Sequence, residues 1–86
     1  MRTLRSANKN NTKAYRYTVL VEPCEEGGYV ATCPALAGCH VQGETYQGTV
    51  KDMRSVIDAY LEDLRENGEP IPQEDFRITS MTVAAR

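Results

Sequence analysis

One apolar stripe at helical spacing, in the second half of the chain, most constrains what this sequence can fold into. Its members recur at intervals of three and four residues: Val50, Met53, Ile57, Tyr60, Leu61 and Leu64. Thr45 is suited to cap the start of such a helix, and Asn67-Gly68 supplies a left-handed stop. The pattern predicts one helix over residues 45–66, roughly 33 Å long, that packs its stripe on a sheet.

The residues before this helix alternate in the way that half-buried strands do. We predict a first strand over residues 15–22, with Tyr15, Tyr17, Val19 and Val21 on its buried side. Two shorter strands over residues 29–33 and 39–42 follow, and short links make the three strands an antiparallel meander. Five glycines are assigned structural roles at the turns and ends of these elements: Gly27, Gly28, Gly38, Gly43 and Gly68.

Residues 76–83 (FRITSMTV) are rich in β-branched side chains and predict a last strand. Because a strand, a helix and a second strand form a right-handed crossover, we expect this strand to lie parallel to the first. The predicted fold class is α+β, in the order β-β-β-α-β, with one long helix packed on a small sheet. The other face of the sheet and its edge strands favour pairing with a second copy, as a homodimer or higher homo-oligomer.

Charge is unevenly distributed along the 86 residues. Residues 1–13 carry four basic and no acidic side chains, and residues 14–86 carry the other six basic and all twelve acidic side chains, a net charge of −6. We predict a flexible basic arm over residues 1–13 and a single domain over residues 14–86. An acidic body of this kind is suited to a basic protein partner.

Several classes of protein are disfavoured. No apolar run approaches the ~20 residues needed to span a bilayer, and the first residues lack the apolar core of a secretory signal, so we expect no membrane association and a cytoplasmic protein. Cys33, Cys39 and His40 lie on or beside short strands, where alternation opposes convergence on zinc or a Cys-His nucleophile pair. The acidic side chains lie mostly at turns and on the outer face of the helix. We therefore expect no metal site, no cofactor, no catalytic residue and no enzymatic activity.

Four short sequence motifs follow one another within residues 17–72, about two-thirds of the chain: EEGGY, PALAGC, VQGET and NGEPIP. They fall at the first turn, the second turn, the third strand and the end of the helix. Taken together, they resemble the HicB-like antitoxin family. The resemblance implies a partial ribonuclease H-like fold without that enzyme's catalytic carboxylates. It also implies a partner: a HicA-like toxin, which is a small basic mRNA interferase whose active site the antitoxin covers.

The sequence departs from the family pattern in three respects. We expect no C-terminal DNA-binding domain, residues 1–13 form a basic arm, and Gln47-Gly48 stands where relatives place acidic residues and alanine. For partner contact we select four glutamates at the first turn and the start of the helix, with solubilising turn acids as the competing interpretation: Glu22, Glu25, Glu26 and Glu44.

Three alternatives to a toxin-binding antitoxin remain open at this point. A dimer could bind nucleic acid through two basic arms, although no DNA-binding domain is recognisable, and this predicts a salt-sensitive affinity lost on deletion of residues 1–13. A solitary family member could bind another protein. A residual metal-dependent nuclease would cleave an RNA–DNA hybrid.

Overall fold

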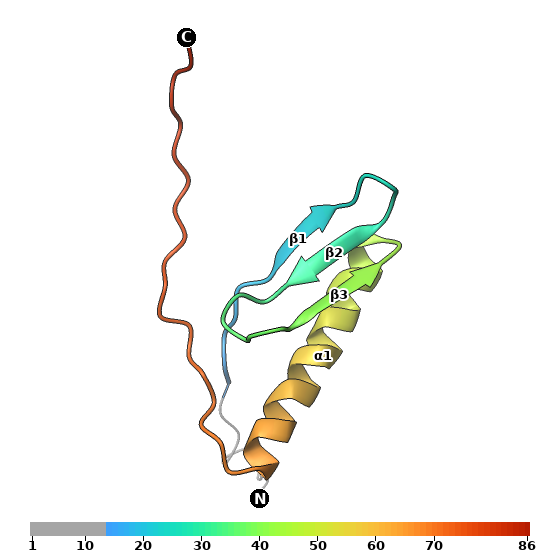
Figure 1. Ribbon diagram of the computed structural model, residues 1–86, viewed down its shortest axis with the longest axis vertical. Helices are drawn as coiled ribbons and strands as arrows, with labels where there is room; N and C mark the ends of the chain where they lie inside the picture. The colour runs from blue at the N-terminus through green and yellow to red at the C-terminus, as the bar shows by residue number, and fades with distance from the viewer. Residues whose placement is uncertain (1–13) are drawn as a thin grey trace, which may run out of the picture.

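The computed structural model describes residues 14–86, and the arm predicted over residues 1–13 lies outside the described residues. The elements follow in the order β1 (Leu20–Pro23), β2 (Tyr29–Thr32), β3 (His40–Gly43) and α1 (Tyr46–Glu66). The helix crosses one face of the three-stranded sheet (Figure 1). The predicted α+β class is confirmed, in the arrangement β-β-β-α.

The strand β2 lies between β1 and β3 and runs antiparallel to both. The register aligns Val21, Ala31 and Val41 in a row that packs toward α1, with Ala31 fully buried. The neighbouring row, Leu20, Thr32 and His40, lies on the opposite face because successive side chains alternate across a strand. One face of the sheet is therefore core and the other is turned away from the helix.

The first strand is shorter than the sequence predicts, because its partner strand ends early. In the observed register Leu20 pairs with Thr32, so residues 15–19 would have to pair with residues from Cys33 onward. At that point the chain turns: the Cys33 N–H donates to the Cys39 carbonyl at 3.0 Å, and the Leu36 N–H donates to the Cys33 carbonyl at 3.1 Å. The β1–β2 ladder consequently begins at Leu20 and not at residue 15.

The helix begins where the sequence predicts, with Thr45 as its N-cap. The Thr45 hydroxyl accepts the Gly48 N–H at 3.0 Å, and the Thr45 carbonyl accepts the Thr49 N–H at 2.9 Å. The first bond satisfies a backbone donor that the first turn of a helix would otherwise leave unpaired, and the second is the first regular hydrogen bond of the helix.

The helix ends in a Schellman motif centred on Gly68, whose φ of +70° is a left-handed conformation that favours glycine. The Gly68 N–H donates to the Arg65 carbonyl at 3.1 Å, and the Glu69 N–H donates to the Leu64 carbonyl at 2.9 Å. The prediction of a helix over residues 45–66 is confirmed at this end as well.

A small core joins the helix to β2 and β3. Its buried apolar side chains are Ala31, Cys33, Leu36, Cys39 and Met53. The helix contributes Met53 and the fully buried Thr49, whose hydroxyl donates to the Thr45 carbonyl at 2.6 Å. The helix contacts β2 and β3 more extensively than it contacts β1. The side of β1 that faces α1 is consequently only half covered.

Residues 69–86 form an extended tail, which passes the segment before β1 and then leaves the body beyond residue 74 (Figure 1). The strand predicted over residues 76–83 is not part of the sheet in the described chain, so the prediction that it pairs with β1 is wrong for this arrangement. A strand needs a neighbouring strand to pair its backbone N–H and C=O groups, and in the described chain no strand edge lies beside residues 76–83. The radius of gyration is accordingly 17.0 Å, against about 11–12 Å for a compact chain of this size.

Candidate protein-binding surfaces

Four exposed glutamates gather at one end of the sheet. Glu22 lies on β1, Glu25 and Glu26 lie in the turn between β1 and β2, and Glu44 lies between β3 and α1. The β1–β2 turn and the β3–α1 connection occupy the same end of the molecule (Figure 1). We call these four residues the acidic end. The sequence selected the same residues, and the fold brings Glu44 to the end occupied by the other three.

The two segments of the acidic end lie close together at Gly28 and Gly43. Gly28 has a φ of +81°, and a Cβ atom added there would lie 2.6 Å from the Gly43 carbonyl oxygen and 3.7 Å from the Glu44 Cα. The turn is closed by the Cys24 N–H, which donates to the Gly28 carbonyl at 2.9 Å. The close approach of Gly28 to Gly43 therefore fixes the distance between the turn and the start of the helix.

The acidic end is not neutralised by ion pairs within the described residues. Between residues 14 and 86, the ion pair within 4 Å joins Arg65 to Glu62 at 3.7 Å, near the far end of the helix. Arg54 and Asp58, which are four residues apart on the same helix, do not form one. The charge of the four glutamates is thus available to an incoming partner.

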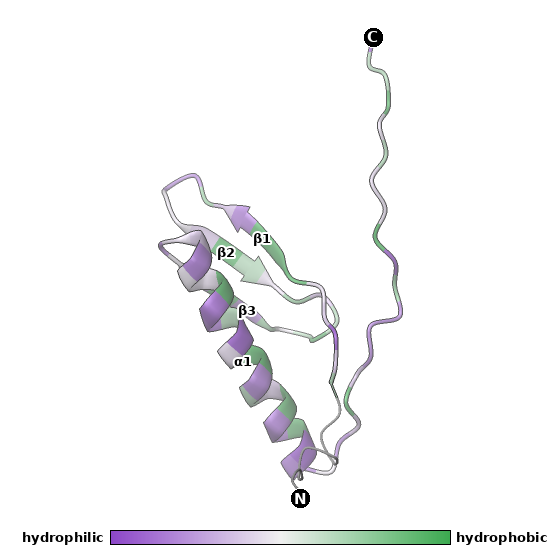
Figure 2. Ribbon diagram, turned by 180° about the vertical axis from the view of Figure 1, so that it is seen from behind, coloured by the Kyte–Doolittle hydropathy of each residue, from purple (hydrophilic) through white to green (hydrophobic). Residues whose placement is uncertain are grey.

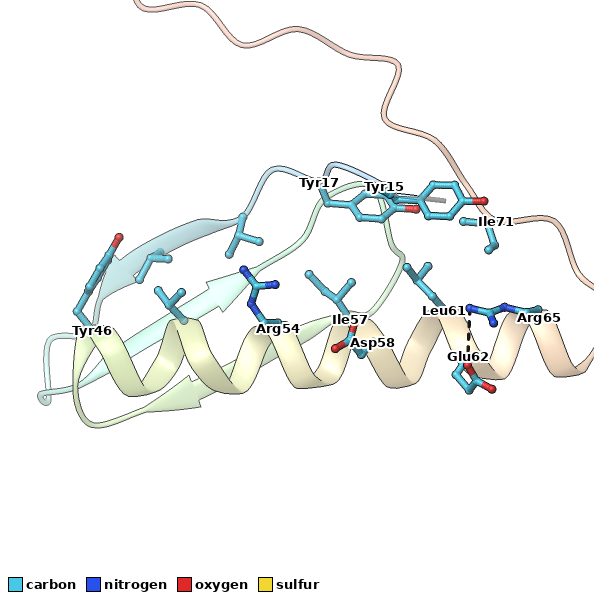
Figure 3. Close-up of a pocket in the computed structure, with 14 residues that line it drawn as sticks. Tyr15, Tyr17, Tyr46, Arg54, Ile57, Asp58, Leu61, Glu62, Arg65 and Ile71 are labelled. Carbon is cyan, nitrogen blue, oxygen red and sulfur yellow. Dashed lines mark ion pairs between the residues drawn. The ribbon is translucent and has the colours of Figure 1, made fainter. Parts of the chain in front are cut away.

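A second surface is a groove of about 650 Å³ between α1 and the segment that leads into β1. We call it the β1–α1 groove. Its apolar lining comes from both sides: Tyr15, Tyr17, Val19, Val21, Val50, Ile57, Leu61 and Ile71. In the close-up, Ile57 and Leu61 point from the helix toward the two tyrosines, whereas Asp58 and Glu62 point away from them (Figure 3). Sequence periodicity assigned these positions, apart from Ile71, to a closed core, and the structure leaves them half open.

The end of the groove nearest the tail is built from aromatic and polar contacts. The rings of Tyr15 and Tyr17 stack with their centroids 6.5 Å apart, and the Tyr17 hydroxyl donates to the Pro72 carbonyl. The Glu74 carboxylate accepts the Thr18 N–H at 2.6 Å and also the Thr18 hydroxyl. These bonds fasten residues 72–74 to the chain just before β1, and the sequence reasoning did not identify them.

The cysteines and the histidine do not converge. Cys33 and Cys39 are buried, whereas Cys24 is half-buried and His40 is exposed. Burial raises the pKa of both the Cys33 and Cys39 thiols. Within residues 14–86, no three His, Cys, Asp or Glu side chains are arranged to hold a metal ion. In the same part of the chain, no helix has both the length and the apolar character needed to cross a membrane.

Comparison with known sequences adds to this geometry. Residues 17–84 match the family model described as a HicB-like antitoxin of bacterial toxin–antitoxin systems. The chain belongs to the HicB-like antitoxin family. The match extends through residue 84, so the HicB-like domain includes the extended tail as well as the sheet and the helix.

Curated relatives of this HicB-like chain are named UPF0150 proteins. One from Synechocystis sp. is 39% identical over 69 residues, which is 80% of this chain and 87% of the relative. One from Thermoplasma acidophilum is 38% identical over 60 residues, which is 70% of this chain and 87% of the relative. Membership of an antitoxin family indicates a role in a toxin–antitoxin system.

Proposed function

We propose that this HicB-like domain neutralises a small basic, mRNA-cleaving toxin of the HicA type by binding over its active site. The acidic end is the proposed contact surface. The observation that carries the proposal is the gathering of four exposed glutamates, without an ion pair among the described residues, in a member of an antitoxin family. The net charge of −6 on residues 14–86 acts in the same direction.

Electrostatics explains why this surface suits such a toxin. A ribonuclease must attract RNA phosphates, so its substrate-binding surface is expected to be basic. Carboxylates presented at the same surface compete with phosphates and steer the encounter between the two proteins. The domain then acts by occlusion in a stoichiometric complex, and the proposed site of action is the cytoplasm, where mRNA is translated.

Growth rescue tests this proposal. A small basic protein of the HicA type from the same genome is expressed with the full chain, and the full chain is expected to restore growth and to copurify with it. A variant with glutamine at all four positions of the acidic end is expected to rescue poorly. The control variant should rescue normally. It carries the neutral amide in place of four other exposed acids, on the helix and just after it: Asp52, Asp63, Glu66 and Glu69. Equal rescue by both variants, or no complex with the wild-type chain, would refute the proposal.

We also propose that the domain self-associates. The strands β1 and β3 are both edges of the described sheet, and apolar side chains remain exposed on β1 and along the tail. Edge strands with exposed apolar side chains are surfaces on which a second chain can pair. Light scattering should give twice the chain mass of 9.6 kDa, and a monomer mass at all concentrations would contradict this proposal.

A further inference from the structure

The tail has the pattern of a strand that lacks its sheet. Phe76 and Ile78 alternate with polar residues and would share one side of a strand, while Met81 and Val83 would share the other. The four side chains are 38%, 62%, 79% and 75% exposed, in chain order. Hydrophobic stretches along the free tail are visible in Figure 2. Such exposure is unusual in a segment that the family match counts as part of the domain.

The strand β1 offers an edge on which the tail of another chain could pair. This strand pairs with β2 on one side, and its other edge is unpaired in the described sheet. The β1–α1 groove opens along the same strand, with Val19, Val21, Val50 and Ile57 half covered or exposed. A strand added at this edge would place one row of side chains over the groove and the other row beside the exposed Leu20.

We infer that residues 76–83 of one chain pair with the free edge of β1 in a second copy, and that the second copy returns its own tail, in a reciprocal strand exchange. Phe76 and Ile78 cover the β1–α1 groove of the partner copy. Met81 and Val83 lie on the outer face near Leu20. The inference rests on the self-association proposed above and is independent of toxin binding.

The path of the tail favours exchange over docking on its own body. The bonds of Tyr17 to Pro72 and of Thr18 to Glu74 hold the base of the tail beside the start of β1. Beyond Glu74 the chain leaves its own body instead of continuing along the β1 edge (Figures 1 and 2). The twelve residues 75–86 span roughly 40 Å when extended, which is ample reach for a neighbouring copy. A fixed base with a free, strand-like end is the arrangement that reciprocal exchange requires.

Mutation of the tail gives the first test. The variant Ile78→Asp places a charge on the groove-facing side of the tail and is expected to raise the dimer dissociation constant at least tenfold. The matched control Ala85→Asp adds the same charge to the same tail outside residues 76–83 and should leave the dissociation constant unchanged. Circular dichroism at 222 nm checks that α1 is intact in both variants. Equal dimerisation of the two variants would overturn the inference.

Cross-linking distinguishes exchange from docking of the tail on its own chain. In a Cys24→Ser background, where the remaining thiols Cys33 and Cys39 are buried, one copy carries Leu20→Cys and a differently tagged copy carries Thr79→Cys. The two variants are mixed, equilibrated and treated with a flexible bis-maleimide. Exchange predicts a cross-linked product containing both tags, at a higher yield than either variant gives alone.

The outcomes separate this inference from the self-association on which it rests. A double variant carries both cysteines in one chain. If it cross-links within a monomer while the mixture gives no two-tag product, the tail docks on its own β1 and exchange is overturned. A dimer that survives Ile78→Asp also overturns exchange but leaves self-association intact. A monomer mass for the wild-type chain overturns both.

Discussion

The contact between the first turn and the start of the helix can be tested with two neighbouring glycines. Gly27 and Gly28 both have positive φ angles, +106° and +81°, so alanine at either position adopts a backbone conformation that costs about 1–2 kcal/mol. Their surroundings differ. A Cβ at Gly27 meets nothing within 4 Å, whereas a Cβ at Gly28 would lie 2.6 Å from the Gly43 carbonyl oxygen. Gly27→Ala is therefore the control for Gly28→Ala.

The extra cost of Gly28→Ala comes from moving one backbone segment away from another. Displacing the Gly43 carbonyl strains the adjacent end of the sheet and weakens at least one hydrogen bond, worth about 1 kcal/mol. We expect Gly28→Ala to lose about 2–3 kcal/mol in free energy of unfolding and Gly27→Ala about 1–2 kcal/mol. In a domain of this size, the difference corresponds to a Tm roughly 4–8 °C lower for Gly28→Ala.

Thermal unfolding followed by circular dichroism at 222 nm measures this difference. Both variants and the wild-type chain are compared at one protein concentration, because association makes Tm depend on concentration. The reasoning is refuted if Gly28→Ala unfolds at the same temperature as Gly27→Ala, since the close approach to Gly43 would then carry no energetic weight.

Four further predictions concern the core, the cysteines and the base of the tail. Met53→Ala removes a fully buried side chain and should lower the free energy of unfolding by about 2–5 kcal/mol, as measured in urea; a loss below about 1 kcal/mol would contradict the assigned core. Cys24 should react with a thiol reagent in the folded protein while Cys33 and Cys39 do not. Because burial raises the pKa of these two thiols above the ordinary 9.0, the unfolded chain loses their protons first, and stability should fall as pH rises through and above 9; a flat alkaline profile would contradict this. Glu74→Gln weakens the charge-assisted bonds at the base of the tail and should lower Tm by a few degrees; an unchanged Tm would show that these bonds contribute nothing.

Local sequence signals predicted the helix well and the strands less well. The helix is delimited by contacts within a few residues, at Thr45 and Gly68, so its ends can be inferred from the chain alone. The first strand depends on a partner: alternation continues back to Tyr15, but pairing stops at Leu20 because the chain opposite turns at Cys33. Periodicity shows that a segment can be a strand, and it does not show how far the neighbouring strand extends.

The same distinction applies to the tail and to the candidate surfaces. The β-branched content of residues 76–83 predicted a strand that the described sheet does not contain, because the identity of a paired edge is a long-range property that composition does not encode. The four glutamates could be selected because turn acids are visible in the sequence. The β1–α1 groove could not, because its apolar residues have the same spacing as a closed core and only the path of the tail leaves them half open.

The central claim is that the acidic end binds a basic toxin, and the most direct measurement is the affinity of the purified chain for the purified toxin as a function of salt. The account predicts a Kd that weakens as salt rises, and a further weakening of at least tenfold when the four glutamates of the acidic end become glutamine. The control variant neutralised at four acids on and after the helix should bind within about threefold of wild type, because charges remote from the interface are screened. An affinity that is independent of salt and equal in both variants would contradict the claim.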